Sequence, residues 1–249
     1  MQDRVAVAQQ QAKIEADTNI QTPTGILESP EILLEEYREN ISFLPKIQQL
    51  CQKYTGIRRS RGDGNCFYRS VAFQVLEHCR ISSAEVVEAA LKKMAEVADG
   101  LHSFFQYERF TYEDFYETFC ENAREVQGKG IEAVEELFVS DMGSLMLVYW
   151  IRLLTSFAIQ SNANTFLPFI MALGYADAQS FCKSQVEPVK VDADQLPVQA
   201  LSEFMGWQIV VEYLDGSTGP LNQHRFGPVA GVPSVLLLYR PGHYDMLVQ

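Results

Sequence analysis

One cysteine of this sequence stands where a nucleophile can be activated. Cys66 directly follows the loop Asp63-Gly64-Asn65 and opens a segment whose apolar residues recur every four positions, which predicts a helix that begins near Cys66. Unpaired N–H groups and the dipole at a helix N-terminus favour a thiolate, and loop N–H groups can bind an oxyanion beside the sulfur. The pattern has the geometry of a nucleophilic cysteine, although the local sequence alone favours a buried packing cysteine after a glycine-rich turn.

The end of the chain contains residues that could assist such a cysteine. His243 and Asp245 are two positions apart on a predicted strand, so their side chains share one face, about 7 Å apart at Cα. A carboxylate at that spacing can fix the imidazole tautomer and leave the other ring nitrogen to face a thiol. A His-x-Asp pair alone is weak evidence, but together with Cys66 it has the composition of a cysteine-hydrolase triad.

The other cysteines and histidines predict no second site. Cys51, Cys79, Cys120 and Cys182 lie in apolar surroundings, and the sequence contains no Cys-x-x-Cys pair. An odd number of scattered cysteines is typical of free thiols in a reducing compartment rather than of a disulfide framework or a zinc site. We therefore expect no metal and no cofactor, and a cytoplasmic protein, with the nucleus as a second candidate compartment.

The composition excludes some classes of partner. The 249 residues include 20 Lys and Arg against 32 Asp and Glu, which gives a formal net charge of −12. Nucleic acids and anionic membrane surfaces require a cationic face, so neither is expected as a partner. The N-terminal sequence has no apolar secretory core, and the longest apolar run, residues 145–151, is far shorter than the roughly 20 residues of a membrane span.

Hydrophobic periodicity predicts one α+β domain in which helices precede a small sheet. A helix over residues 83–98 is expected to stop at Asp99-Gly100, and Thr111-Tyr-Glu-Asp114 has the form of a capping box at the start of the next helix. Further helices are expected over residues 141–159 and 165–173, and strands over residues 208–213, 234–239 and 244–248.

Two motifs together resemble the ovarian-tumour (OTU) class of deubiquitinating cysteine proteases. They are Asp63-Gly64-Asn65-Cys66-Phe67-Tyr68-Arg69 and Gly242-His243-Tyr244-Asp245. From about residue 30 to the end, the intervening segments resemble the otubain branch in the same order; they are residues 112–115, 149–156, 181–182, 186–188, 211–213 and 238–245. The resemblance implies a papain-like OTU fold with a small β-sheet between helical regions. It also implies hydrolysis of isopeptide bonds in polyubiquitin, with a preference for chains linked through the lysine at ubiquitin position forty-eight.

The resemblance also implies a role for each motif residue. Cys66 is the expected nucleophile, His243 the general base and then acid, and Asp245 the residue that orients the imidazole. The loop Asp63-Gly64-Asn65 and the Cys66 amide are expected to form the oxyanion hole. Glu187, within Val186-Glu-Pro188, and Tyr244 are the candidates for lining the cleft.

The N-terminal residues leave two interpretations open. Residues 1–25 are expected to form a flexible arm before a catalytic domain over residues 26–249, and the arm is either an idle tail or a helix that forms on a partner. The expected partners are ubiquitin, polyubiquitin and ubiquitin-conjugating enzymes, bound by a monomer. An alternative function is therefore non-catalytic inhibition of conjugating enzymes through ubiquitin binding and the arm. A cysteine hydrolase of another substrate is a third, more distant alternative.

Overall fold

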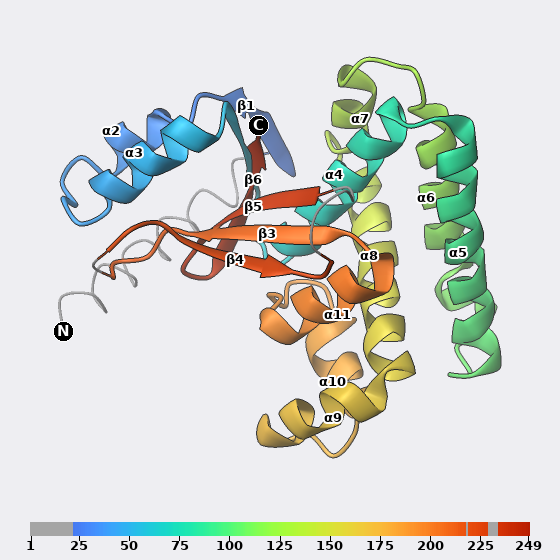
Figure 1. Ribbon diagram of the computed structural model, residues 1–249. Coiled ribbons are helices and arrows are strands. Elements are labelled where there is room, and N and C mark those ends of the chain that lie inside the picture. Colours follow the sequence, from blue (N-terminus) through green and yellow to red (C-terminus); the bar gives the residue numbers. More distant parts are fainter. Residues whose placement is uncertain (1–21, 218, 229–233) are drawn as a thin grey trace.

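The structure, a computed structural model, describes residues 22–217, 219–228 and 234–249 (Figure 1). A six-stranded mixed sheet has the strand order β1-β2-β6-β5-β3-β4, and every neighbouring pair is antiparallel except β3 and β5. The strands are β1 (Thr24–Glu28), β2 (Gly56–Ser60), β3 (Gln208–Tyr213), β4 (Asn222–Phe226), β5 (Ser234–Arg240) and β6 (His243–Val248). The three strands predicted from the C-terminal sequence are confirmed as β3, β5 and β6.

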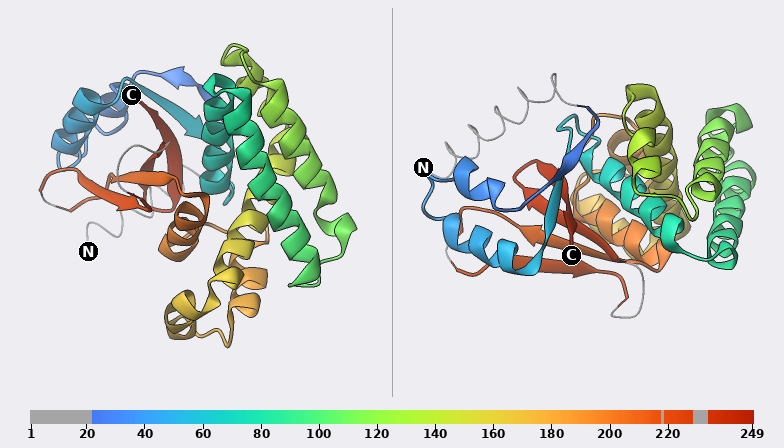
Figure 2. Two further views of the ribbon diagram at one scale, coloured as in Figure 1. Left: turned by 45° about the vertical axis from the view of Figure 1, so that its right-hand side comes forward. Right: turned by 90° about the horizontal axis from the view of Figure 1, so that it is seen from above.

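The sheet lies between helical regions, as the OTU fold class predicts. On one face, α4 (Cys66–Ile81) packs against β5 and β6 and joins the main core with α5, α6 and α8 (Figure 2). On the other face, α2 and α3 bury Leu33, Ile47 and Leu50 against Ile57 and Leu247 of the sheet. The remaining helices are α2 (Ile32–Glu36), α3 (Leu44–Lys53), α5 (Ala84–Ser103), α6 (Glu113–Glu125), α7 (Glu132–Leu137), α8 (Asp141–Ser161), α9 (Ala163–Ala172), α10 (Ala178–Phe181) and α11 (Gln195–Met205), with short turns η1 (Arg109–Thr111) and η2 (Cys182–Val186).

Helix α8 is the central support of the helical layer. It contacts α4, α6 and α11, and its interior side chains include the fully buried Trp150 and Arg152. By length and composition it is the one helix of the described part that could cross a membrane, but 67% of its apolar window is buried inside the fold. The packing thus gives α8 the place of a core helix.

Two expected helix ends are wrong. Helix α5 continues through Gly100 to Ser103, because Gly100 packs against the Phe157 ring: a Cβ on Gly100 would lie 2.4 Å from Phe157 Cε2. This glycine therefore serves helix packing rather than termination. Helix α6 begins at Glu113 after Tyr112, and no side chain caps it, so the expected capping box at residues 111–114 is not formed.

The sheet begins before the expected domain boundary. Strand β1 starts at Thr24 and pairs with β2, so residues 24 and 25 belong to the sheet although the sequence placed them in the N-terminal arm. Residues 1–21 of that arm lie outside the described residues.

Candidate active site

Cys66 is the first residue of α4 and is almost fully buried, with 1% exposure. Its Sγ accepts a hydrogen bond of 3.4 Å from the backbone N–H of Tyr244, which lies between His243 and Asp245 on β6. Residues 178 positions apart in the sequence are therefore in direct contact. The expected helix start at Cys66 is confirmed, and the fold brings it to the His-x-Asp strand.

His243 and Asp245 form the pair that period-two alternation predicts. His243 Nε2 lies 2.9 Å from Asp245 Oδ1, and both side chains are buried. The carboxylate fixes the proton on Nε2, since it can only accept a hydrogen bond when ionised. His243 Nδ1 is buried and has no hydrogen-bond partner among the described residues. The ring nitrogen left for the thiol is therefore Nδ1.

Asp245 is held ionised by cationic and polar groups from three strands. Oδ1 also accepts a hydrogen bond of 2.9 Å from the Ser60 N–H, and Oδ2 accepts one of 2.6 Å from Arg240 Nη2. Arg59 Nη1 lies 3.5 Å from Oδ2. Burial alone would raise the pKa of Asp245, but the charges of Arg240, His243 and Arg59 hold it far below its usual range. The orienting carboxylate is thus fixed in charge and position.

His243 has a pKa well above its ordinary value. Burial lowers it, but the charges of Asp245 and Cys66 outweigh burial and raise the pKa to about 9. The imidazole is therefore protonated at neutral pH and faces the sulfur as a cation. A protonated imidazole beside the sulfur can stabilise a thiolate, which is the nucleophilic form of a cysteine.

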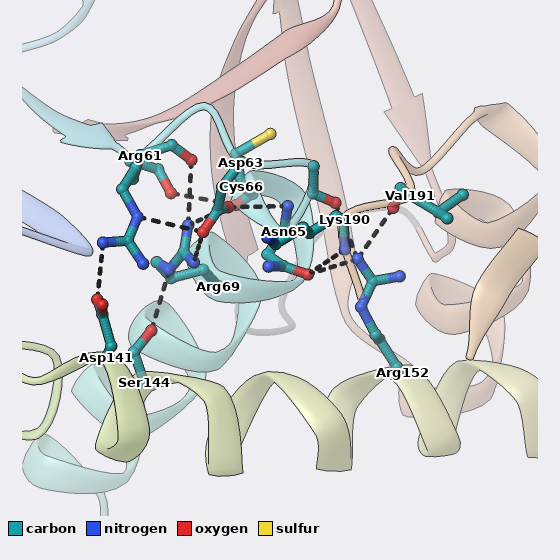
Figure 3. A network of polar contacts seen from close by, with 12 residues as sticks. Arg61, Asp63, Asn65, Cys66, Arg69, Asp141, Ser144, Arg152, Lys190 and Val191 are labelled. Atoms are coloured by element: carbon teal, nitrogen blue, oxygen red, sulfur yellow. Dashed lines mark hydrogen bonds and ion pairs between the residues drawn. The ribbon is translucent and has the colours of Figure 1, made fainter. Parts of the chain in front are cut away.

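The loop before Cys66 is fixed by a buried arginine on α4 (Figure 3). Arg69 donates hydrogen bonds of 2.9 and 2.7 Å to the two carboxylate oxygens of Asp63, and a further one of 3.0 Å to Ser144 on α8. Burial alone would raise the pKa of Asp63, but Arg69, the Asn65 N–H and Arg61 together lower it to about 2. The Asp63 side chain consequently supports the loop from within.

A second buried arginine, Arg152 on α8, joins three segments at this loop (Figure 3). Its Nη2 donates to Gly64 O and Asn65 Oδ1, both at 2.8 Å, and to Val191 O at 2.9 Å, while Nη1 donates to Val186 O at 2.8 Å. The sequence analysis included Arg152 in an otubain-like segment, residues 149–156, but assigned it no role in the site. The sequence nevertheless indicates that Arg152 is special, because a charged side chain within a buried helix requires hydrogen-bond or ionic partners.

The loop conformation requires glycine at position 64. Gly64 has a φ of +74°, and a Cβ there would lie 2.4 Å from the carbonyl carbon of Lys190. Lys190 also has a positive φ of +66°, and its N–H donates to Asn65 Oδ1 at 3.1 Å. The backbone at residues 190 and 191 is therefore packed directly on the Cys66 loop.

The donors of the expected oxyanion hole differ in availability. The Asn65 N–H donates a 3.0 Å hydrogen bond to Asp63 Oδ1, so it is occupied in this conformation. No acceptor for the Cys66 N–H occurs among the residues that the structure describes. The Cys66 N–H, at the positive end of α4, is thus the donor most directly available beside the sulfur.

The constellation of Cys66, His243 and Asp245 matches that of a papain-like cysteine peptidase, and comparison with known proteins agrees. The model of the peptidase C65 otubain family matches residues 15–249. The chain belongs to this otubain family. Human ubiquitin thioesterase OTUB1 is 36% identical over 253 residues, which cover 97% of this chain and 89% of the relative. The OVARIAN TUMOR DOMAIN-containing deubiquitinating enzyme 1 of Arabidopsis thaliana is 37% identical over 239 residues, covering 86% and 77%.

Solved otubain structures share the whole fold. A complex of h/ceOTUB1 with ubiquitin aldehyde and UBC13~Ub matches with a TM-score of 0.84 and 26% identity, over 99% of this chain and 98% of that chain. A ceOTUB1 complex with ubiquitin aldehyde and UBC13~Ub matches with a TM-score of 0.85 and 28% identity, over 96% and 98%. The expected OTU architecture is confirmed.

The two cleft-lining candidates of this otubain have different surroundings. Glu187 Oε1 accepts hydrogen bonds from Tyr107 Oη at 2.5 Å and from Ser156 Oγ at 2.7 Å, so its carboxylate links the loop after α5 to helix α8. The Tyr244 side chain is buried, and its Oη donates to Ala193 O at 3.3 Å. The contact of Tyr244 with the sulfur is made by its backbone, whereas its ring is part of the core.

Proposed function

We propose that this otubain is a cysteine-type deubiquitinase that hydrolyses isopeptide bonds of polyubiquitin. The single observation that carries the proposal is Cys66 at the start of α4, facing a histidine whose Nε2 is bonded to Asp245. The raised pKa of His243, about 9, supports a protonated imidazole beside the sulfur at neutral pH. The names of the relatives, ubiquitin thioesterases and a deubiquitinating enzyme, support ubiquitin as the substrate.

In the first half-reaction, the Cys66 thiolate attacks the carbonyl carbon of the C-terminal glycine of ubiquitin, which forms the isopeptide bond with the lysine amine. The developing oxyanion lies beside the Cys66 N–H and the preceding loop. His243 transfers its Nδ1 proton to the lysine amine as the C–N bond breaks. The lysine side chain leaves as a neutral amine, and ubiquitin stays bound to Cys66 as a thioester.

In the second half-reaction, His243 is neutral and acts as a base. Its Nδ1 takes a proton from a water molecule, whose oxygen adds to the thioester carbonyl. The C–S bond then breaks, and the electron pair returns to Cys66 as a thiolate beside the imidazolium. The released ubiquitin acid loses its proton to solvent, which restores the starting enzyme.

The proposal is tested with a ubiquitin that carries a C-terminal electrophile. The wild-type protein is expected to form a covalent adduct, and Cys66→Ala is expected to form none. The matched control is Cys182→Ala, which should still be labelled. Cys182 is also buried, and its Sγ contacts Ser156 O. Labelling that survives Cys66→Ala would exclude Cys66 as the nucleophile.

The finer part of the proposal is a preference for chains linked through the lysine at ubiquitin position forty-eight. The resemblance to the otubain branch supports it. The test is cleavage of di-ubiquitins of every linkage, with Cys66→Ala as the control for contaminating proteases. Equal cleavage of all linkages would contradict the preference and leave the deubiquitinase activity intact.

A second candidate function is inhibition of ubiquitin-conjugating enzymes without catalysis. It is favoured by the likeness to OTUB1 complexes that contain UBC13~Ub or UBCH5B~Ub, each with a TM-score of 0.84. Under this proposal, Cys66→Ala still suppresses chain assembly, whereas deletion of residues 1–21, which leaves strand β1 intact, abolishes the suppression. If the deletion has no effect on chain assembly, this second function fails.

A further inference from the structure

The two arginines that contact the catalytic carboxylate also share a second carboxylate, that of Glu36 at the end of α2. Glu36 Oε1 forms an ion pair of 2.5 Å with Arg59 Nη2, and its Oε2 lies 3.8 Å from Arg240 Nη1. The same guanidinium groups face Asp245, with Arg240 Nη2 at 2.6 Å and Arg59 Nη1 at 3.5 Å from its Oδ2. Both arginines therefore lie between an inner and an outer carboxylate.

The packing of α2 on the sheet places Glu36 at this position. Leu33 of α2 is fully buried in the same apolar cluster as Leu247 of β6. Glu36 follows Leu33 by three positions, so it lies on the same side of the helix. Leu247 follows Asp245 by two positions, so the two side chains share one face of the strand. The side of α2 that buries Leu33 consequently brings Glu36 to the sheet face that carries Asp245.

The charges of this cluster balance only when the outer carboxylate is included. Arg59 and Arg240 carry two positive charges, and Asp245 supplies one negative charge. Their side chains are 12% and 10% exposed, so water screens little of the repulsion between the two guanidinium groups. In the described part of the chain, Glu36 is the one carboxylate besides Asp245 that contacts both arginines. It supplies the second negative charge, which allows both groups to stay at Asp245 Oδ2.

We propose that Glu36 is a positioning residue for the catalytic pair: it holds Arg59 and Arg240 in place, and they hold the Asp245 carboxylate against His243. The inference rests on the proposed cysteine-hydrolase function and adds to its machinery a residue from outside the two motifs. The arginines occupy Asp245 Oδ2, which directs Oδ1 to His243 Nε2 at 2.9 Å. If one arginine turns away, the carboxylate is free to rotate, and the imidazole loses its fixed orientation.

The test variant is Glu36→Gln, which removes the charge and keeps the length of the side chain. The first matched control is Glu35→Gln, because Glu35 is the preceding residue of α2 but its side chain is 74% exposed and pairs with Arg38. The second control is Glu28→Gln, because Glu28 Oε2 lies 3.6 Å from Arg59 Nε on the same arginine. All three variants lose one negative charge, and only Glu36→Gln removes the link between the two arginines.

The primary measurement is the low-field proton NMR resonance of the His243 Nε2–H group, identified by its absence in His243→Ala. It reads the hydrogen bond to Asp245 directly and does not require activity. In Glu36→Gln we expect this resonance to broaden or vanish through exchange with solvent, whereas both controls should keep it. The spectra are recorded where urea denaturation shows every variant to be folded.

The second measurement is the rate of adduct formation with the ubiquitin electrophile. In Glu36→Gln the maximal rate should fall about tenfold with the half-saturation concentration unchanged, because the orientation of the imidazole is altered and the substrate contacts are not. Glu35→Gln and Glu28→Gln should keep the wild-type rate. Arg59→Gln should also slow the reaction, and Glu36→Gln should add little to it in the double variant, because both substitutions disrupt the same support.

Four results would overturn the role of Glu36. One is an unchanged resonance and an unchanged rate in Glu36→Gln, which would make its ion pairs structural only, even if stability falls. Another is an equal loss in either control, which would assign the effect to overall charge. The third is a raised half-saturation concentration at an unchanged maximal rate, which would make Glu36 a substrate contact. The fourth is a fully additive effect of Glu36→Gln and Arg59→Gln. Absence of adduct formation in the wild type is a separate result, which counts against the proposed function and not against the NMR measurement.

Discussion

Arg69 holds both carboxylate oxygens of Asp63, with Nη1 at 2.9 Å from Oδ1 and Nη2 at 2.7 Å from Oδ2. The two residues stand six positions apart, one before and one after Cys66. Their ion pair closes the loop onto the first turns of α4, and Arg69 Nε extends the link to Ser144 on α8. The motif around Cys66 is therefore a structural unit as well as a source of chemistry.

The first prediction concerns stability at acid pH. Asp63 has a folded-state pKa of about 2, below its ordinary value of 3.8, so its contribution is complete above pH 4 and is lost as pH falls through about 2. The shift corresponds to about 2 kcal/mol of unfolding free energy. The measurement is the unfolding free energy from urea denaturation between pH 2 and 7. It should fall less towards acid pH in Asp63→Asn than in the wild type, and the remaining fall should include the contribution of Asp245.

The control for this prediction is Asp141→Asn. Asp141 Oδ1 forms an ion pair with Arg61 Nη1 at 2.7 Å in the same network, but the Asp141 side chain is 66% exposed. Exposed pairs contribute about 0–1 kcal/mol, so this variant should retain the wild-type dependence on pH. Equal curves for Asp63→Asn and the wild type would show that the Arg69 pair is not coupled to folding.

The second prediction separates backbone strain from steric conflict at the Cys66 loop. Gly64→Ala introduces a side chain at a positive φ and places its Cβ 2.4 Å from backbone atoms of Lys190. Gly174→Ala has a φ of +90° but open space around the added Cβ. Backbone strain should cost each variant about 1 kcal/mol of stability. Gly64→Ala should lose more than this because of the steric conflict, and its labelling rate should fall at least about tenfold. Thermal melts and adduct formation measure the two effects.

A Gly64→Ala variant that is labelled at the wild-type rate would contradict the packing of Lys190 on this loop. Gly174 lies after α9, far along the chain from the motif, so its variant should keep the full labelling rate. The comparison therefore distinguishes loss of the active loop from general destabilisation.

The third prediction concerns Asp245→Asn. The asparagine amide is uncharged, so it no longer fixes the proton of His243 on Nε2 as the carboxylate does. Turnover should therefore fall by at least about 100-fold. The substitution also removes the closer of the two carboxylates that pair with the buried Arg240 and leaves only Glu36 at 3.8 Å, so the protein should lose several kcal/mol of stability. Arg240→Gln is the comparison: it should destabilise the fold but keep the His243–Asp245 bond, and hence more of the turnover. Full turnover of Asp245→Asn would mean that another residue orients the imidazole.

Local patterns predicted the catalytic geometry better than they predicted the support around it. Alternation on a strand was sufficient to pair His243 with Asp245, and helical spacing was sufficient to begin a helix at Cys66. Both are short-range rules. The contact of Cys66 with the Tyr244 backbone depends on how α4 packs on β6, and only the combination of motifs suggested it.

The partners of the supporting residues could not be predicted, because they are distant in sequence. Arg152 contacts Gly64, Asn65 and Val191, which no spacing rule connects with it. The same reason explains the error at Gly100, where a neighbouring helix and not the local sequence decided the role of the glycine. Tertiary packing overrides local propensity at both positions.

The last prediction tests that packing at Gly100. Replacing a glycine in a helix interior with alanine usually stabilises the helix by about 1 kcal/mol. Here the added Cβ would lie 2.4 Å from Cε2 and 2.9 Å from Cζ of Phe157, whose ring is flanked by the rings of Phe105 and Phe204. We therefore expect Gly100→Ala to destabilise the protein by about 1 kcal/mol or more.

The partner substitution Phe157→Leu removes the outer ring atoms that cause the conflict. In that background, Gly100→Ala should be neutral or stabilising, because the helix propensity of alanine then acts without the clash. Urea denaturation of the wild type, both single variants and the double variant gives the coupling energy, which should favour the double variant by at least about 1 kcal/mol. Additive effects would mean that Gly100 and Phe157 do not constrain each other, and that the helix passes through this glycine for another reason.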